Sequence, residues 1–420
     1  MKKRLVFALS TTLLCYLLFL FFYPLYYSSD SLMAAIVVDG LFSANNFSQF
    51  QHPLFCIIVR ILTPLLPTVD IFTLLLHLTV ALGFFSMAYY LSAPAMVKPL
   101  KSWRVPDFIY FIILFLGIVF LSAGVNIWNN NYTITAGAFV FMGLVLNISL
   151  FDNEKRSERD SRVRCIVSVV MIAMGIMLRR ESALLFLPFI ILDLTISVME
   201  QRSEWKRALH RYLPCLLIFL LLIGSREVMY SIEPYATASR YNDARTAIMD
   251  FPMKGATEVD IDSIDYTSAI NYWTFADTDN MDVEKLEEIA TAGTKNAFPL
   301  SWAGFTAVMS KIKHDVFHTN LYMSSLVVGT ALLLLRTLLC ARMWGRIESV
   351  LAVVGGLLIM IYFTFRGRAP MRVWEPVLMA TDYLMIRVAA TPRRARSHRG
   401  RFSLTLYSTS HERQRLIPTD

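Results

Sequence analysis

The chain has 420 residues, of which 55% are hydrophobic and 17% charged, and its formal net charge is +8. With a mean hydropathy of +0.50 it carries more apolar surface than a soluble core could bury, which excludes a soluble globular protein and indicates a polytopic membrane protein. All five cysteines lie in or beside apolar runs, so the sequence predicts neither a disulfide framework nor a metal cluster.

Ten apolar runs approach or exceed the roughly 20 residues that a transmembrane helix needs. The first directly follows a basic start, MKKR, and has no small-residue cleavage site, so we interpret it as a retained signal anchor. The predicted spans cover residues 5–26, 69–91, 107–123, 132–151, 165–177, 183–199, 212–230, 321–339, 349–365 and 373–388. We therefore expect an all-α polytopic membrane protein with about ten transmembrane helices.

The basic residues give this helix bundle an orientation. They collect at the N-terminus, in the loops after even-numbered spans and in the C-terminal tail, so the positive-inside rule puts these segments and both termini in the cytoplasm. Four regions follow: an N-terminal membrane module (1–230), an extracytoplasmic segment (231–320), C-terminal membrane helices (321–390) and a basic tail (391–420). Attraction to anionic membrane lipids, about 1 kcal/mol per basic residue, explains the tail better than nucleic-acid binding does.

The first outer loop, residues 28–67, contains the first candidate catalytic groups. Its two short amphipathic pieces, 31–42 and 53–66, cannot span a bilayer but are apolar enough to lie along its surface as interfacial helices. Asp30 stands where the first span ends, Asp39 lies near the end of the first piece, and His52 opens the second. Asp30 suits a catalytic base at the membrane surface, and it suits a helix N-cap nearly as well.

Two short outer loops carry positive charge against the topological rule. Residues 177–182 hold Arg179, Arg180 and Glu181, and residues 365–372 hold three further arginines, Arg366, Arg368 and Arg372. Guanidinium groups match phosphate oxygens in geometry, so these loops predict a site for an anion at the outer surface. The alternative is pairing with lipid phosphates or with nearby carboxylates such as Glu181 and Glu375.

The extracytoplasmic segment is acidic, with 14 Asp and Glu against 7 Lys and Arg in residues 231–320. The apolar spacing after Asp282 predicts a helix that ends at Gly293, and Ser301 is suited to cap a second helix leading into the eighth span. We expect a small helical cap, with residues 241–274 unassigned. The alternating carboxylates of residues 258–262 lack the turn glycine of a calcium loop, which favours a solvated acidic face over a metal site.

The order of these features resembles the GT-C-type glycosyltransferases, and more narrowly a group of uncharacterised bacterial membrane proteins of that superfamily. The matching stretches are SSD at 28–30, YTITA at 132–136, RESALLFLP at 180–188 and RGRAPMRV at 366–373. The resemblance implies sugar transfer from a polyprenyl-phosphate donor to a glycan, lipid or protein acceptor at the outer face of a bacterial plasma membrane. The related pattern often has two adjacent acidic residues after span one, whereas only Asp30 stands here. The resemblance therefore implies no definite cofactor and leaves a divalent cation open.

In that chemistry Asp30 takes the proton of the acceptor hydroxyl, which predicts inversion at the anomeric carbon unless Asp39 forms a covalent intermediate. Arg368 and Arg372 are first in line to stabilise the leaving phosphate, with Arg179 and Arg180 second and His52 and Glu181 as further cleft candidates.

A transporter or flippase of an anionic or lipid-linked substrate is the alternative function. Two polar groups within predicted spans, His77 and Asp193, are compatible with it, because an ionisable residue inside the membrane is a functional candidate. Such groups also commonly pair with neighbouring helices. The chain shows no convincing repeat between its halves and its unexpected charges lie at the outer surface, so we favour the enzyme. A protein that only binds a partner through its acidic cap would leave the arginine loops unexplained.

Overall fold

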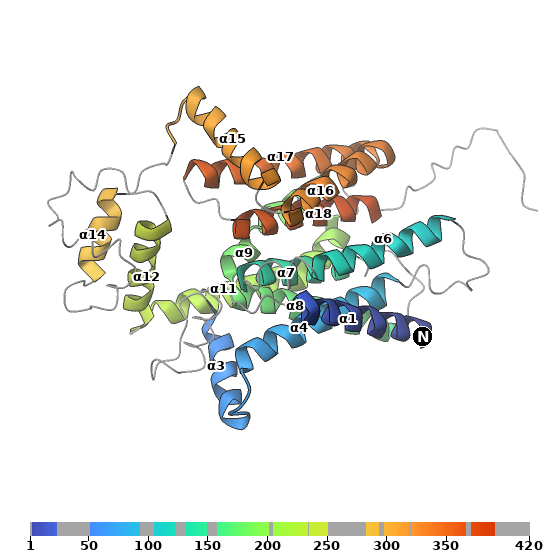
Figure 1. Ribbon diagram of the computed structural model, residues 1–420, viewed down its shortest axis with the longest axis horizontal. Coiled ribbons are helices and arrows are strands. Elements are labelled where there is room, and N and C mark those ends of the chain that lie inside the picture. Colours follow the sequence, from blue (N-terminus) through green and yellow to red (C-terminus); the bar gives the residue numbers. More distant parts are fainter. Residues whose placement is uncertain are drawn as a thin grey trace, which may run out of the picture.

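A computed structural model describes residues 2–22, 51–92, 105–122, 132–148, 158–200, 205–233, 235–250, 283–293, 298–318, 321–366 and 371–390. Within these ranges every regular element is helical, which confirms the predicted all-α class (Figure 1). Six helical stretches are long and apolar enough to cross a membrane, which identifies a multi-pass membrane protein. They are Ile71–Leu91, Ser161–Leu178, Arg180–Met199, Tyr212–Tyr230, Met323–Cys340 and Met343–Phe365.

In the first 230 residues, a helix occupies each of the seven predicted spans. These helices, with the short helix of the first outer loop, are α1 (Lys2–Phe22), α3 (Pro53–Leu62), α4 (Ile71–Leu91), α6 (Val105–Ser122), α7 (Tyr132–Ile148), α8 (Glu158–Leu178), α9 (Arg180–Leu184), α10 (Leu187–Glu200) and α11 (Trp205–Tyr230). A 3-10 turn, Thr63–Leu65, extends α3 and confirms a short helix in the second predicted piece of the loop. The first piece, 31–42, lies outside the described residues.

Two of these helices differ from the predicted spans. The fifth span was predicted too short: α8 begins at Glu158 because part of the expected basic loop is helical, and Arg164 is 1% exposed there. The sixth span is interrupted between α9 and α10. Pro188, in the first turn of α10, has no backbone N–H to donate to the preceding turn, so α10 starts as a separate helix.

The second half of the chain begins on the predicted outer face. Its helices are α12 (Tyr235–Asp250), α14 (Val283–Gly293), α15 (Trp302–His318), α16 (Leu321–Cys340), α17 (Met343–Phe365) and α18 (Met371–Ala390). The predicted helix ending at Gly293 is confirmed as α14. Ser301 caps α15 as predicted, since its Oγ accepts the N–H of Gly304 at 3.1 Å. Helix α12 was not predicted.

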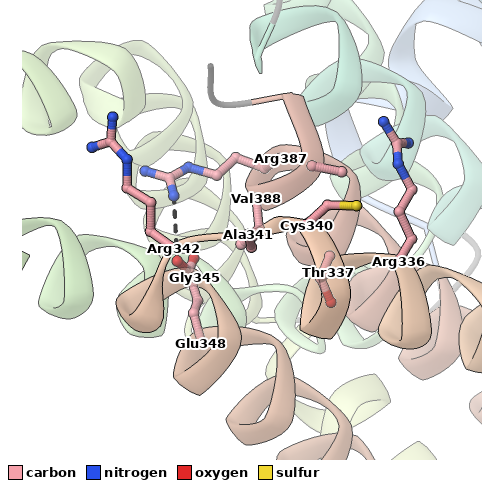
Figure 2. A pocket seen from close by; sticks show the side chains of 10 residues that line it. Arg336, Thr337, Cys340, Ala341, Arg342, Gly345, Glu348, Arg387 and Val388 are labelled. Carbon is pink, nitrogen blue, oxygen red and sulfur yellow. Dashed lines mark hydrogen bonds and ion pairs between the residues drawn. The ribbon is translucent and has the colours of Figure 1, made fainter. Parts of the chain in front are cut away.

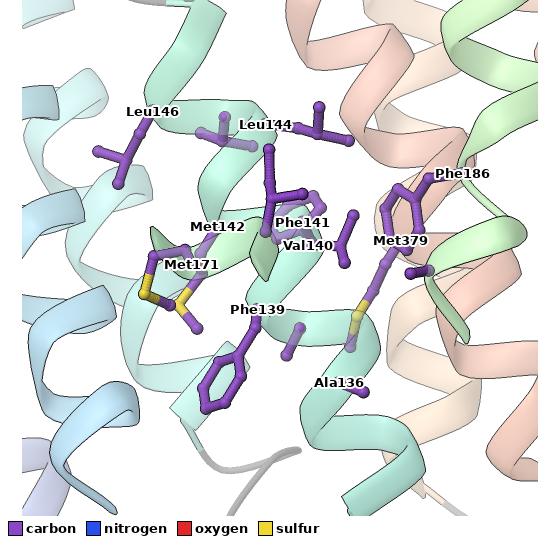
Figure 3. Packing of buried hydrophobic residues seen from close by; sticks show 14 of the residues in the cluster. Ala136, Phe139, Val140, Phe141, Met142, Leu144, Leu146, Met171, Phe186 and Met379 are labelled. Carbon is purple, nitrogen blue, oxygen red and sulfur yellow. The ribbon is translucent and has the colours of Figure 1, made fainter. Parts of the chain in front are cut away.

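Helix α7 forms the centre of the bundle. Every one of its residues is buried, and it packs against α4, α8 and α18. Two glycines allow α7 and α8 to approach closely. A Cβ on Gly143 would lie 2.7 Å from the Ser168 carbonyl oxygen, and one on Gly175 would lie 2.7 Å from that of Ala136. Small residues at such crossings are how membrane helices gain packing energy. Figure 3 shows the side chains that fill the space around α7.

Helix α18 is the second central element, and it packs against α7, α16 and α17. It is unusually polar for its position because Glu375 and Asp382 are buried along it and Arg387 stands near its end. Thr330 of α16 donates a hydrogen bond to Asp382 Oδ1 at 2.8 Å. These charges explain why α18, although a long buried helix, lacks the composition of an apolar span.

Candidate functional site

Five charged residues come together at the turn between α8 and α9 and at the C-terminal end of α11. We call Arg179, Arg180, Glu181, Arg226 and Glu227 the outer arginine cluster. Arg179 Nε lies 3.0 Å from Glu181 Oε2, and Arg180 Nε lies 3.0 Å from Glu181 Oε1. Arg180 also pairs through Nη1 with Glu227, whose Oε1 lies 3.4 Å from Arg226 Nη1. Thus Arg179 and Arg180 do contact a local carboxylate, as the alternative explanation of their charge predicted.

The cluster is only partly shielded from solvent. The side chains of Glu181 and Glu227 are 50% and 57% exposed, whereas those of Arg179 and Arg226 are 12% and 9% exposed. Aromatic rings hold these two arginines: the guanidinium of Arg179 lies 5.8 Å from the Tyr132 ring centre and that of Arg226 lies 4.6 Å from the Tyr230 ring centre. Arg179 Nη1 also donates to the Tyr132 hydroxyl at 3.2 Å. The cations are therefore fixed, while the carboxylates face solvent and can be exchanged for another anion.

His52 is part of the framework beside the cluster. Its Nδ1 accepts the N–H of Leu54 at 3.0 Å, so it is the N-cap of α3, and the proton on Nε2 is donated to the Leu222 carbonyl at 2.8 Å. Its own N–H donates to the Met177 carbonyl at 2.7 Å. Burial lowers the pKa of His52, and the positive charge of Arg226 lowers that pKa further. His52 joins α3 to α11 through its buried side chain and to α8 through its backbone, a role that fits a structural residue better than a cleft residue.

Helix α12 presents a carboxylate to the cluster. Burial raises the pKa of Asp243, while the charges of Arg180 and Arg226 lower it and that of Glu181 raises it, with a net shift upward. Asp243 is thus an additional carboxylate near the outer arginine cluster, contributed by the segment that follows α11. Its raised pKa is a property that general bases share.

An apolar groove of about 480 Å³ begins at Glu181 and runs between α9, α10 and α17. Apart from that glutamate its lining is Leu184, Leu185, Pro188, Leu358, Ile359, Tyr362 and Phe363. The groove is open along its side, which in a membrane would face the acyl chains. Glu181 also belongs to the outer arginine cluster, so the apolar groove and the guanidinium groups of Arg179 and Arg180 meet at this residue.

The other predicted site residues have different outcomes. Asp30, Asp39 and Arg368 lie outside the described residues, as does the side chain of Arg372, which belongs to the first turn of α18. Arg366 is half-buried at the C-cap of α17, where its N–H donates to the Tyr362 carbonyl at 3.1 Å. Of the two predicted arginine loops, one therefore forms a cluster in the described residues. In that loop Arg179 and Arg180 contact Glu181, and His52 lies near the cluster.

Arg226 and Glu227 were missed by the sequence analysis. They occur in the stretch LLIGSREVMY, which was assigned whole to the seventh span. A charged pair in the last turn of an apolar run is itself a signal, because ionisable residues near a membrane are costly unless they have partners or a function.

A second ionic group lies near the start of α17 and the end of α18, where both helices meet α10. We call Asp193, Glu348 and Arg387 the inner ion network. Arg387 Nη2 lies 2.8 Å from Asp193 Oδ1 and Arg387 Nη1 lies 3.3 Å from Glu348 Oε2. Tyr212 hydrogen-bonds both Asp193 and Tyr383 through its hydroxyl. The expectation that Asp193 pairs with a neighbouring helix is confirmed, since Arg387 belongs to α18.

Among the described residues no group of three or more His, Cys, Asp or Glu side chains is arranged to hold a metal ion. Comparison with protein-family models, with characterised proteins and with solved structures finds no match to this chain. The geometry of its own residues is therefore the basis for assigning a function.

Proposed function

We propose that this protein is a multi-pass membrane glycosyltransferase that acts on a lipid-linked substrate at the outer face of the membrane. The observation that carries the proposal is the junction of the apolar groove with the outer arginine cluster at Glu181. A prenyl chain matches the apolar lining, and its phosphate matches the guanidinium groups at the end of the groove. The finer topology belongs to the same proposal: ten spans, α3 lying along the outer interface, and α12, α14 and α15 forming the cap.

The cluster suits a charged ligand because its ion pairs can exchange partners. Ion pairs exposed to solvent contribute only about 0 to 1 kcal/mol. A phosphate can therefore take the place of the Glu181 or Glu227 carboxylate as the partner of an arginine at little cost. The phosphodiester of a polyprenyl-phosphate sugar carries one negative charge, as a carboxylate does, and a second charge builds on the phosphate when its bond to the sugar breaks. Planar guanidinium donors therefore bind the leaving phosphate more strongly than they bind Glu181 or Glu227. Arg179 and Arg226, held by Tyr132 and Tyr230, would need little rearrangement to bind it.

In the proposed reaction the acceptor oxygen attacks the anomeric carbon while the bond to the phosphate oxygen breaks. The arginines stabilise the charge that builds on the phosphate, and a carboxylate takes the acceptor proton. Asp30 is our first choice for the base, on the basis of its position after the first span. Asp243 of α12 is a described carboxylate that interacts electrostatically with Arg180 and Arg226 without forming an ion pair in the cluster, and we rank it next, ahead of Asp39.

The test is transfer by purified protein in nanodiscs, with radiolabelled polyprenyl-phosphate sugars as donors and a membrane extract as acceptor. We expect Arg180→Gln to lower kcat/KM by about a hundredfold, the effect of losing one donor to a developing charge. Asp30→Asn should lower kcat by a hundredfold or more if Asp30 is the base. The matched control is Arg240→Gln, which removes an exposed arginine of α12 that pairs with Glu284 and Glu287 instead.

Full activity in Arg180→Gln would contradict the phosphate role of the cluster. Full activity in Asp30→Asn with loss in Asp243→Asn would move the base to α12. Absence of transfer with every donor, together with movement of a labelled polyprenyl phosphate across proteoliposome membranes, would replace the enzyme by the alternative below.

A transporter or flippase of an anionic or lipid-linked substrate is the second candidate, and the inner ion network favours it. Asp193 and Glu348 are 0% and 1% exposed within the helical bundle. Ionisable groups in such positions commonly belong to ion or substrate pathways. Replacing Glu348 by Gln should abolish transport in that case, whereas an enzyme acting at the other end of the helices should keep its kcat in the fraction that folds.

A further inference from the structure

A polar cavity of about 70 Å³ lies where α16 ends, α17 begins and α18 ends (Figure 2). Three arginines, Arg336, Arg342 and Arg387, and one carboxylate, Glu348, are in its lining. One water molecule needs about 10–15 Å³ of such cavity volume, so there is room for a tetrahedral phosphate group. We propose that this cavity binds the phosphate of an anionic phospholipid from the leaflet that we expect to be cytoplasmic.

Two carboxylates contact one of the three arginines that line the cavity. Arg387 is fixed at its base by Asp193 at 2.8 Å and Glu348 at 3.3 Å, so these carboxylates are directed at one guanidinium. In Figure 2, Arg342 and Arg336 lie on opposite sides of the ion pair between Arg387 and Glu348. With three arginines and one glutamate, the lining carries more positive than negative charge, which favours an anionic ligand.

The first turn of α17 adds to this field. Arg342 is the N-cap of α17 and makes no side-chain capping hydrogen bond, and the first turn contains no acidic residue. Gly345 of that turn lines the cavity. The partial positive charge at a helix N-terminus favours an anion, and it acts here in the same direction as the arginines.

The surroundings indicate a lipid rather than a free anion. Leu335, Leu339 and Met343 belong to the same helix ends as the cavity and are 53%, 66% and 74% exposed. In a membrane such side chains contact acyl chains, so a phosphate in the cavity would be continuous with lipid lying on α16 and α17. The proposal is independent of the outer-face activity, because the cavity and the groove lie at opposite ends of α17.

The experiment is native mass spectrometry of the detergent-purified protein, titrated with phosphatidylglycerol or with phosphatidylcholine. We expect wild type to prefer phosphatidylglycerol and Arg336→Gln/Arg342→Gln to bind it about twenty-five-fold more weakly, a factor of about five for each basic residue near the lipid charge. Arg336→Lys/Arg342→Lys should stay within a few-fold of wild type. The charge-matched control is Lys311→Gln/Lys313→Gln, which changes two exposed lysines of α15.

Thermal unfolding of each variant in detergent establishes that the two glutamine substitutions leave the fold intact. Equal binding of phosphatidylglycerol by wild type and the glutamine variant would overturn the proposal, as would equal loss in the α15 control. Displacement of the lipid by millimolar inorganic phosphate would assign the cavity to free phosphate and overturn its assignment to a lipid.

Discussion

The outer arginine cluster and the inner ion network use the same chemistry in opposite surroundings. In the outer cluster the carboxylates Glu181 and Glu227 are half exposed. In the inner network Asp193 and Glu348 are withdrawn almost completely from solvent. An exposed ion pair contributes little to stability and can exchange partners, whereas a buried pair strongly destabilises the fold when one member is lost. The carboxylates of the outer arginine cluster can therefore give up their partners to a ligand, whereas the charges of the inner ion network maintain the packing of α10, α17 and α18.

The largest expected effect is on the inner network. Replacing Arg387 by Gln leaves Asp193 and Glu348 buried without their shared cation, which should lower the free energy of unfolding by about 3 to 5 kcal/mol. Thermal and denaturant unfolding in detergent measure this loss. The control is Arg336→Gln, which removes an exposed arginine from the lining of the cavity that also contains Arg387. A loss below about 1 kcal/mol in Arg387→Gln would remove the distinction between the two ionic groups.

A smaller effect is expected at His52, which joins α3 to the helices of the outer cluster. Replacing it by Ala removes an N-cap and the side-chain hydrogen bond to the Leu222 carbonyl, a loss of about 2 kcal/mol. Hydrogen exchange of the α3 amides is the appropriate measurement, because a peripheral helix can open without global unfolding. His52→Asn keeps a capping side chain and should exchange more slowly than His52→Ala.

The same residue makes the outer region sensitive to pH. Because the folded structure lowers the pKa of His52 from its ordinary value of 6.5, its contribution to stability is complete above that value. It is lost as the pH falls from 6.5 through the folded pKa, because the unfolded chain binds the proton first. Exchange of the α3 amides, corrected for intrinsic rates, should accelerate over that range in wild type and not in His52→Asn. Identical profiles in both proteins would refute this linkage.

In the outer cluster we expect a still smaller effect on stability. Glu227→Gln should change the free energy of unfolding by less than about 1 kcal/mol, since its side chain is 57% exposed and water screens its pairs with Arg180 and Arg226. The matched substitution in the inner network, Glu348→Gln, should be clearly more destabilising. Equal losses in the two variants would show that the outer pairs are structural and not exchangeable.

The smallest effect is expected in α12 and α14, the helices between the two membrane regions of the chain. Arg240 of α12 pairs with Glu287 through two contacts, at 2.9 and 2.6 Å, and with Glu284 at 3.2 Å. The three side chains are between 40% and 71% exposed to solvent. These charges raise the pKa of Arg240 and lower the pKa of Glu287. Arg240→Gln should speed hydrogen exchange in α14 slightly at low salt, and the difference should vanish at 1 M salt. A difference that persists at 1 M salt would point to packing by Arg240.

The sequence was informative wherever apolar length or spacing decides the structure. Runs of apolar residues predicted the long helices, and Ser301 and Gly293 predicted ends of α15 and α14. Helix α18 was predicted even though its charges remove the apolar signal, whereas α12 has little amphipathic pattern and was missed. Its position depends on contacts with α11 and α14 that no local pattern contains.

The candidate site was only partly predictable for the same reason. The excess of arginine on the outer side identified Arg179 and Arg180, because topology alone made their charge unexpected. Arg226 and Glu227 were hidden inside an apolar run, and their meeting with Arg180 depends on how α11 packs against α8. Likewise the partner of Asp193 could be expected on another helix but not named, since Arg387 is nearly two hundred residues away.

The position of Arg387 has a consequence for biosynthesis. A ribosome makes Asp193 and Glu348 well before α18, which carries their counter-ion and covers one side of the fully buried α7. Until α18 enters the bilayer, the two carboxyl groups lack their shared counter-ion and α7 lacks a neighbour. Insertion of α18 thus completes the packing around α7 and supplies the cation that both acids share. A nascent chain stopped before residue 371 would present to the membrane quality-control machinery exposed small-residue surfaces and uncompensated acids, which distinguish it from the finished protein.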